Sequence, residues 1–385
     1  MNVAEPKAPP PERSTPTVPF VRPYFEVDDD LLMSIRMILE SGKVTNNGVF
    51  ARRFEAAVAE YLGVPDAVAV ASGAAGLFIS LRAMGLTRRK VVLPAYTFIA
   101  TLNAALDNGL QPVWCDIDPE TFTMSPQHLR RIVENESDIG CVIPVNVFGT
   151  PPPLEIIRST AEWCGAAVLY DDAHGFGTET DGRRFSPHAD AEVFSFHASK
   201  VMPAVEGGAI IAKDHSLLWK SRQLRNHGLA RHLLDSLPGT NGKLDEVRAA
   251  IGARNLQTFP SALARRRQYG GWLRGRVLRH SEVFLTQGVP EAVRTNYQNF
   301  ALRCRVTSEA GPDTLIAAFA REGVEVRSYF NPPLNRLTCW PRVEELPNTE
   351  AVWRSTVCLP LHSRMSELEL GTVDQALSAV SRQLV

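Results

Sequence analysis

The chain has 385 residues, of which 44% are hydrophobic and 22% charged, as is usual for a globular protein of more than one domain. Its formal net charge of −1 gives no overall attraction to nucleic acid or to an anionic membrane surface. No apolar run predicts a transmembrane helix or the core of a signal peptide, so we expect a cytoplasmic protein. The six cysteines form no C-x-x-C pair, which predicts reduced, buried thiols and no metal centre.

The N-terminal residues 1–19 are rich in proline and polar side chains, and we expect them to be disordered. After two helices, short apolar strands alternate with helices from residue 67 onwards. Predicted helices cover about 28–41, 50–62, 74–84, 99–108, 125–134 and 152–164, and predicted strands cover 67–70, 91–94, 112–116, 141–147 and 166–170. This alternation favours a mainly parallel sheet with helices on both faces, to which segments near Phe194 and at 208–212 add a hairpin.

The pattern changes after about residue 250. A long helical stretch follows at 244–278, with breaks expected at Pro260 and at Gly270-Gly271. Further strands are predicted at 299–306 and 324–326, and further helices at 313–321 and 366–384. We therefore expect a large α/β domain over residues 20–250 and a smaller α+β domain over residues 251–385.

One lysine stands in a distinctive position. The hexapeptide Ser-Phe-His-Ala-Ser-Lys at 195–200, followed by Glu-Gly-Gly at 206–208, places Lys200 between an apolar strand and a glycine turn. Close to Phe194 and Phe196 its amine would be partly desolvated, which lowers the pKa and favours the nucleophilic form. Such an amine can form a Schiff base with an aldehyde cofactor. The alternative is a solvated surface lysine.

Upstream, an apolar strand ends in Asp171 and Asp172, and His174 follows. Ligands gather at the carboxyl ends of strands in open α/β sheets, where a carboxylate can keep the ring nitrogen of a heterocyclic cofactor protonated. A helix cap or a loop acid is the alternative, and the local pattern leaves open which aspartate points inward. His174 could contact a ring hydroxyl or be solvated.

Two other segments could hold parts of a cofactor. The turn from Ser72 to Gly76 joins a strand to a helix, and its free backbone N–H groups suit a phosphate, to which Ser195 could add a hydroxyl. Phe98 begins a helix after a short strand and could stack on a flat ring or belong to the core. The basic runs at 88–90 and 265–267 lack interleaved aromatic residues, so we expect no nucleic-acid partner.

In chain order these segments resemble the DegT/DnrJ/EryC1/StrS family of sugar aminotransferases, which use pyridoxal 5′-phosphate (PLP) on the fold-type-I aspartate aminotransferase scaffold. The likeness extends from about Phe25 to the C-terminus. Further landmarks stand at 42–48, 94–101, 144–149, 224–228, 241 and 359–362.

The resemblance implies a role for each candidate. Lys200 would hold the cofactor's aldehyde. Asp171 would pair with the ring nitrogen, because its spacing to His174 selects it over Asp172. His174 would lie near the ring oxygen, and Phe98 would stack on the ring.

The resemblance also implies phosphate contacts and a homodimer with shared active sites. The hydroxyl of Ser195 and the backbone of Gly73, Ala74 and Ala75 would hold the phosphate within one subunit. Asn241 would reach the phosphate of the neighbouring subunit.

Four positions depart from the family's usual pattern. Ala74 replaces a threonine, which removes one phosphate-binding hydroxyl, and Val205 replaces a glycine in the turn after Lys200. Lys243 stands where arginine is common, and Asn335 stands where a histidine often follows the Pro-Pro pair. The last two departures affect residues expected near the substrate.

The implied activity is transfer of an amino group from L-glutamate to a nucleotide-linked keto sugar in amino-sugar biosynthesis of natural products. The motifs favour a 4-keto-6-deoxyhexose aminated at C4 over C3. The alternatives are an aminocyclitol or other keto-sugar acceptor, a non-catalytic homologue, and a sugar dehydratase of the same scaffold, in which histidine replaces the lysine. No G-x-G-x-x-G follows the first strand, which argues against a nicotinamide oxidoreductase.

Overall fold

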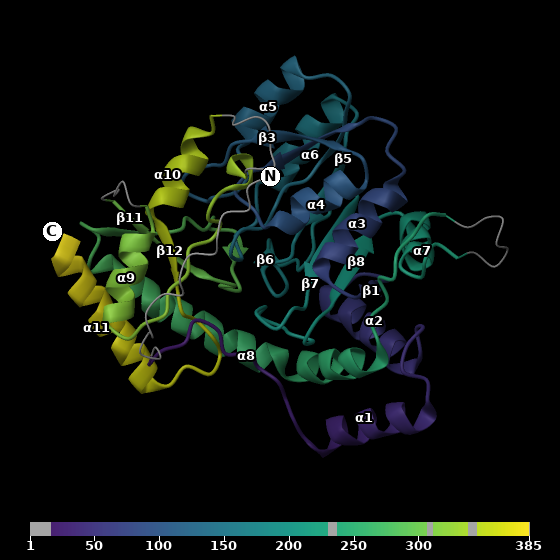
Figure 1. Cartoon of the computed structure of the whole chain (residues 1–385), viewed down its shortest axis with the longest axis horizontal. Helices are drawn as coiled ribbons and strands as arrows, with labels where there is room; N and C mark the ends of the chain where they lie inside the picture. Colours follow the sequence, from purple (N-terminus) through teal and green to yellow (C-terminus); the bar gives the residue numbers. More distant parts are fainter. Residues whose placement is uncertain (1–16, 230–236, 306–310, 338–344, 385) are drawn as a thin grey trace, which may run out of the picture.

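The computed structural model describes residues 17–229, 237–305, 311–337 and 345–384 (Figure 1). A seven-stranded sheet forms the larger part, with the order β1-β8-β7-β5-β4-β2-β3. Its strands are β1 (Val68–Val70), β2 (Lys90–Pro94), β3 (Gln111–Cys115), β4 (Ile139–Val142), β5 (Ala167–Asp171), β7 (Ala191–Ser195) and β8 (Gly208–Ala212). Of these strands only β8 runs against the others, which confirms the predicted mainly parallel sheet and its late hairpin.

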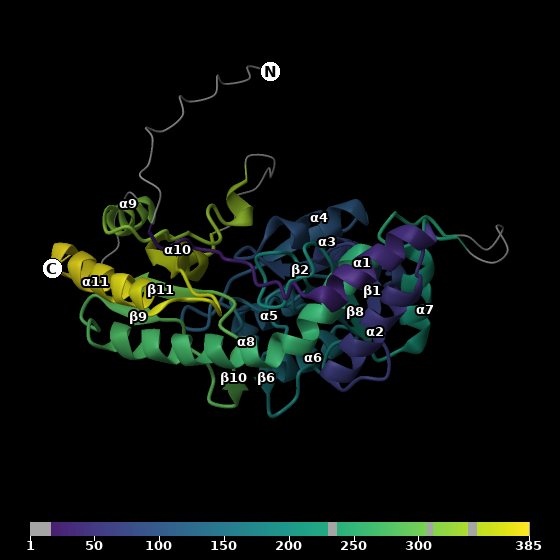
Figure 2. The ribbon, with the colours of Figure 1, turned by 90° about the horizontal axis from the view of Figure 1, so that it is seen from below.

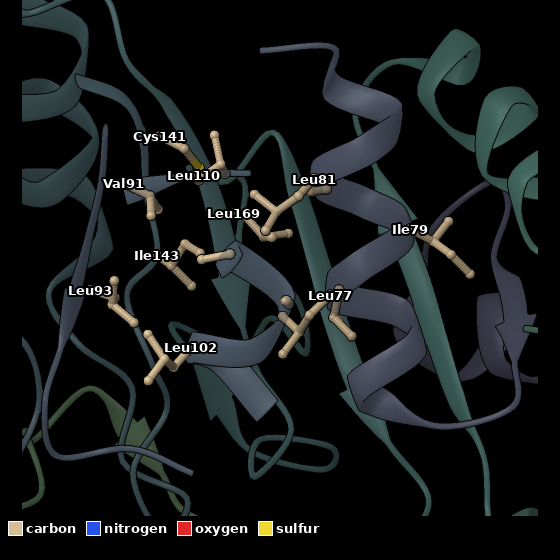
Figure 3. Packing of buried hydrophobic residues seen from close by; sticks show 14 of the residues in the cluster. Leu77, Ile79, Leu81, Val91, Leu93, Leu102, Leu110, Cys141, Ile143 and Leu169 are labelled. Atoms are coloured by element: carbon tan, nitrogen blue, oxygen red, sulfur yellow. The ribbon is translucent and has the colours of Figure 1, made fainter. Parts of the chain in front are cut away.

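Helices cover both faces of this sheet. They are α2 (Val49–Leu62), α3 (Gly73–Met84), α4 (Ile99–Asp107), α5 (Pro126–Asn135), α6 (Leu154–Trp163) and α7 (His215–Leu224). The first helix, α1 (Asp29–Ser41), packs outside them on other helices. Alternate strand residues enter different cores. Leu169 lies in a core with residues of α3 and α4 (Figure 3) and of α7, whereas Val168 and Tyr170 lie in a core with residues of α5 and α6. Because both faces are buried, these strands are apolar throughout.

A second, three-stranded sheet has the order β12-β11-β9. It consists of β9 (Phe284–Thr286), β11 (Phe300–Cys304) and β12 (Thr356–Leu359), and packs with α9 (Asp313–Arg321) and α11 (Glu367–Leu384) in a separate apolar core. Near it lies α10 (Pro347–Ser355), whereas the short 3₁₀ helix η2 (Leu334–Arg336) packs on the core of the large sheet through Leu334. The strands β6 (Glu179–Thr180) and β10 (Val293–Arg294) form a small ribbon. The predicted boundary near residue 250 stays a prediction, because one helix extends across it.

That helix, α8 (Glu246–Leu278), is continuous over 33 residues and runs along both parts of the molecule (Figure 2). The predicted breaks at Pro260 and Gly270-Gly271 are therefore wrong. Its first half packs against α2 and its second half enters the core of the smaller sheet, and this packing outweighs the helix-breaking tendency of proline. Gly270 provides close packing, since a Cβ there would lie 2.6 Å from the Tyr297 ring.

The expected disordered tail lies mostly outside the described residues, but its last part is ordered. Val18 is fully buried and forms a backbone bridge with Val324, so the prediction of disorder up to residue 19 is wrong at that end. Of the strand predicted at 324–326, only Val324 forms a bridge, so no strand is present there. Cys115, Cys141, Cys164, Cys304 and Cys358 are free thiols, and Cys339 lies outside the described residues. Within the described ranges no helix is long and apolar enough to cross a membrane.

Candidate active site

The carboxyl ends of three parallel strands converge at one edge of the large sheet. In the sheet register Gly208 lies opposite Val70 of β1 on one side and opposite Ser195 of β7 on the other. A Cβ at Gly208 would lie 2.8 Å from the Gly73 nitrogen, and a Cβ at Gly73 would lie 3.0 Å from the Ser195 Cβ. The glycines therefore permit the turn after β1 to lie directly against the end of β7.

The N-terminus of α3 points its N–H groups into this region. Ser72 caps the helix, its Oγ accepting from the Ala75 N–H at 3.1 Å. In the described part of the chain no hydrogen bond uses the N–H groups of Gly73 or Ala74. Two free N–H groups, the positive end of a 12-residue helix and the nearby Ser195 hydroxyl make a site for a phosphate. The Ala75 N–H, whose contact with the phosphate stays a prediction, donates to the Ser72 Oγ in this structure.

Lys200 lies in the turn that follows β7. Its backbone N–H donates to the His197 carbonyl at 2.9 Å, and the turn closes where Ala204 N–H donates to the Phe196 carbonyl at 2.7 Å. Burial lowers the pKa of the Lys200 amine to about 8, although the nearby Asp171 carboxylate acts in the opposite direction. The uncharged, nucleophilic fraction of the amine near neutral pH is therefore much larger than in a solvated lysine.

Asp171 is the carboxylate on the Lys200 side of the sheet. Its Oδ2 accepts from the Thr101 Oγ1 at 2.7 Å, and its Oδ1 accepts from the Ala173 N–H at 3.2 Å. Burial raises the pKa of Asp171, while these two hydrogen bonds and the charge of Lys200 lower it. Thr101 lies one turn into α4, and local sequence around Asp171 contains no signal for this partner.

Asp172 points to the opposite face. There it contacts Tyr170, Asn146 and Glu192, and burial raises the pKa of Asp172 to about 7 and that of Glu192 well above its usual value. The two aspartates diverge because successive residues of a strand project to opposite faces. This places Asp171 on the side of Leu169, and Asp172 on the side of Tyr170.

His174 is held as a neutral ring with a defined tautomer. Its Nδ1 accepts from the Phe148 N–H at 3.2 Å, so its proton is on Nε2. Burial, and secondarily the charge of Lys200, lower the pKa of His174 well below its usual value. Its ring stacks on that of Phe148 with centroids 5.9 Å apart, and its carbonyl accepts from Asn296 Nδ2 at 2.7 Å. No hydrogen bond from the Nε2–H is found among the residues that the structure describes, and this donor suits an anionic oxygen.

Phe98 and Asn241 lie at the edges of this arrangement. Phe98 precedes α4, three residues before Thr101, and is 60% exposed. Asn241 is also exposed and forms a backbone bridge with Asn226. Among the described contacts within one chain, none joins Asn241 to Lys200 or Ser195.

The departure at Val205 has a structural consequence. Its φ is +69°, a left-handed conformation that disfavours β-branched residues, and its side chain is 41% exposed. We expect Val205→Gly to stabilise the protein by about 0.5–1 kcal/mol, because relief of this strain exceeds the entropy cost of glycine and little packing is lost. Thermal unfolding measures the change. Val205→Ala is the control that keeps a Cβ, and a Val205→Gly protein less stable than wild type would contradict the prediction.

Comparison with known proteins agrees with this geometry. The family model described as the DegT/DnrJ/EryC1/StrS aminotransferase family matches residues 26–378. The chain belongs to this family. The family membership confirms the fold-type-I scaffold, PLP as the cofactor and the activity of a PLP-dependent sugar aminotransferase.

Two curated relatives cover most of the chain. Protein Rv3402c of Mycobacterium tuberculosis is 32% identical over 381 residues, which are 94% of this chain and 90% of the relative. The dTDP-4-amino-4,6-dideoxy-D-glucose transaminase of Shigella dysenteriae is 28% identical over 342 residues, covering 88% of this chain and 92% of the relative.

Two solved structures are also similar. DesI, crystallised in the presence of its TDP-sugar product, is 30% identical with a TM-score of 0.87, covering 96% of this chain and 93% of the DesI chain. The aminotransferase TlmJ of Streptoalloteichus hindustanus is 26% identical with a TM-score of 0.83, covering 93% of this chain and 97% of the TlmJ chain.

The residues present fit PLP. An amine with a pKa of about 8, a buried carboxylate on the same side of the sheet, and a helix N-terminus with two free N–H groups match the aldehyde, ring nitrogen and phosphate of the cofactor.

Proposed function

We propose that this aminotransferase moves the amino group of L-glutamate to C4 of a nucleotide-linked 4-keto-6-deoxyhexose. The observation that carries the proposal is the placement of Lys200 and Asp171 on one side of the sheet, close enough that each shifts the pKa of the other. The Shigella relative, a dTDP-4-amino-4,6-dideoxy-D-glucose transaminase, favours nitrogen at C4 of a dTDP-linked sugar, and the TDP-sugar product of DesI favours the same kind of nucleotide. The proposed amino donor follows from the family resemblance.

Each residue has a proposed task. The cofactor, when bound, supplies an aldehyde that carries the amino group in transit and a ring that accepts an electron pair. Lys200 would hold the aldehyde at rest and then, once displaced by the donor's amine, move a proton between the two reacting carbons. Asp171 would keep the ring nitrogen protonated, and Thr101 would fix the orientation of that carboxylate.

The remaining candidates would bind and orient. His174 would donate its Nε2–H to the ring oxygen, because its Nδ1 is occupied by Phe148. Gly73, Ala74 and Ser195 would bind the phosphate, and the exposed Phe98 would cover one face of the ring.

Isotope labelling tests the donor and the position of amination. Incubation of the holoenzyme with ¹⁵N-glutamate and a panel of nucleotide-linked 3-keto and 4-keto sugars is expected to give a product with ¹⁵N bonded to C4, detected by NMR. The same sugars without the nucleotide are the control. Nitrogen at C3, or transfer only from another amino acid, would reject the corresponding part of the proposal.

We also propose a homodimer in which Asn241 acts in the partner's site, supported by the exposure of Asn241 and its lack of contacts to Lys200 within one chain. Mixing and refolding two inactive proteins, Lys200→Ala and Asn241→Ala, is then expected to restore about a quarter of wild-type activity, because mixed dimers contain one intact site. Each variant mixed with itself is the control, and no recovery in the mixture would place Asn241 in its own subunit's site.

A further inference from the structure

A small cavity lies beside Lys200, on the side of the smaller sheet. Its volume is about 20 Å³. Its walls come from five separate segments: the N-terminal residues 20–23, the turn at 198–200, α8, the residues just before β11, and the segment from the end of β12 to His362. Among the lining residues, Arg266 and His362 have properties that the reaction described so far does not use.

Arg266 is a buried cation without a carboxylate partner. It is 9% exposed, and its guanidinium donates to two neutral acceptors, the carbonyls of Tyr297 at 2.8 Å and Gln298 at 2.7 Å. Within the described ranges no acid forms an ion pair with it, whereas Arg22 at the same cavity pairs with Glu369 at 2.7 Å. Burial lowers the pKa of Arg266 to about 9, so it is charged at neutral pH. A buried charge of this kind favours an anion.

His362 is a buried polar group with no hydrogen bond in the described part of the chain. It is 4% exposed, and neither Nδ1 nor Nε2 has a partner. Burial lowers the pKa of His362 to about 4, so the ring is neutral and carries one N–H donor. Buried polar groups in folded proteins nearly always have partners. The unpaired N–H of His362 therefore indicates a ligand that completes the site.

We propose that Arg266 and His362 bind the carboxylate of the amino donor while its amine reacts beside Lys200. This inference rests on the proposed amino transfer and adds the donor's binding site to it. An amino acid that reacts at Lys200 carries a carboxylate on the reacting carbon, so the anion must lie next to the lysine. The carboxylate neutralises Arg266 and accepts the His362 N–H.

The size and position of the cavity distinguish the donor's carboxylate from the sugar substrate and from the cofactor's phosphate. A single water molecule needs about 10–15 Å³ of such space. A cavity of about 20 Å³ therefore has room for one water-sized group, such as an oxygen of a carboxylate, and not for a hexose ring. The cofactor's phosphate has its own site at the N-terminus of α3. The sugar substrate would thus bind without using Arg266 and His362.

His362→Leu tests the proposal, because it removes the N–H hydrogen-bond donor of His362 and replaces the ring with an apolar side chain of similar size. Single-turnover measurements on the holoenzyme are expected to show a dissociation constant for glutamate raised about tenfold or more. The second half-reaction, in which the amino group passes from the aminated cofactor to the keto sugar, is expected to keep its rate. Calorimetric titration with glutarate, an unreactive dicarboxylate, is expected to show the same weakening.

Matched controls separate this role from a general loss of structure. His280 contacts Ser378 at 3.3 Å in the smaller part, so His280→Leu is expected to leave glutarate binding unchanged. 4-Aminobutyrate, which lacks a carboxylate on the reacting carbon, is expected to react equally with wild type and His362→Leu. Thermal unfolding of His362→Leu is expected to match or exceed wild type, because His362 loses no hydrogen bond.

The proposal is overturned if His362→Leu binds glutarate as wild type does, or if both half-reactions fall equally. These outcomes are independent of the sugar's identity. If no nucleotide-linked sugar is aminated, the glutamate half-reaction and glutarate titration still report on Arg266 and His362.

Discussion

Lys200→Ala is expected to abolish turnover. The variant loses both the amine that holds the cofactor and the group that moves the proton, and proton transfer alone accounts for roughly 10²–10⁴-fold in rate. The amine is suited to this work because burial lowers its pKa from 10.5 to about 8. Steady-state kinetics measure the loss, and borohydride reduction followed by peptide mapping shows whether the cofactor is attached at Lys200.

The matched control is Lys213→Ala, which removes an exposed lysine just after β8 and is expected to keep activity. Near-normal turnover in Lys200→Ala, or a borohydride label on another residue, would remove the catalytic assignment.

The lowered pKa of Lys200 also makes the stability of the cofactor-free protein depend on pH. Between pH 8 and 10.5 the unfolded chain binds a proton at Lys200 that the folded, cofactor-free protein does not. The buried amine therefore costs stability below pH 8, by between about 1 and 3 kcal/mol once its partial exposure is discounted, and the cost disappears as the pH rises towards 10.5. Cofactor-free Lys200→Met, which keeps the side-chain volume, is expected to unfold at a higher temperature than wild type at pH 7 and at a similar one at pH 10.5.

Asp171→Asn is expected to reduce kcat/KM by at least about 10²-fold, the effect of removing one preorganised charge or hydrogen bond from a reacting centre. Asparagine keeps the shape and still accepts the Thr101 hydroxyl, but it carries no negative charge to hold a proton on the ring nitrogen. Measurement of kcat/KM for both substrates, with thermal unfolding to check the fold, tests this effect.

The chain provides its own control one residue further on. Asp172→Asn makes the same chemical change on the opposite face of the sheet, beside Tyr170 and Glu192, and is expected to keep most of the activity. A larger loss in Asp172→Asn than in Asp171→Asn would reverse the assignment of the two aspartates.

Much of the fold could be predicted because its signals are local. Strands and helices alternate with clear apolar patterns, and the hairpin of β7 and β8 follows from two apolar segments around a glycine turn. The breaks predicted in α8 failed for the opposite reason. Proline and glycine signal a break locally, whereas the contacts that keep α8 continuous come from α2 and the smaller sheet.

The candidate site residues likewise fall into those that local motifs indicate and those that only the fold brings together. Lys200, Ser195 and the turn at Gly73 stand in recognisable motifs, and the family resemblance added roles for His174, Phe98 and Asn241. Thr101 is 70 residues from its partner Asp171, and Arg266 and His362 meet Lys200 only through folding. No local pattern indicates such partners.

The sequence by itself determined the family, the cofactor and the lysine that would carry it, because these depend on motifs that persist along the chain. The resemblance already selected Asp171 over Asp172, but only the tertiary structure shows that Asp171 faces that lysine and which buried groups lack a partner. Both faces of this parallel sheet are buried, so the composition of β5 does not distinguish them, and the direction of Asp171 follows from the contacts of Leu169 and Thr101. An unpaired buried cation is likewise a property of its surroundings, which the fold assembles from distant segments.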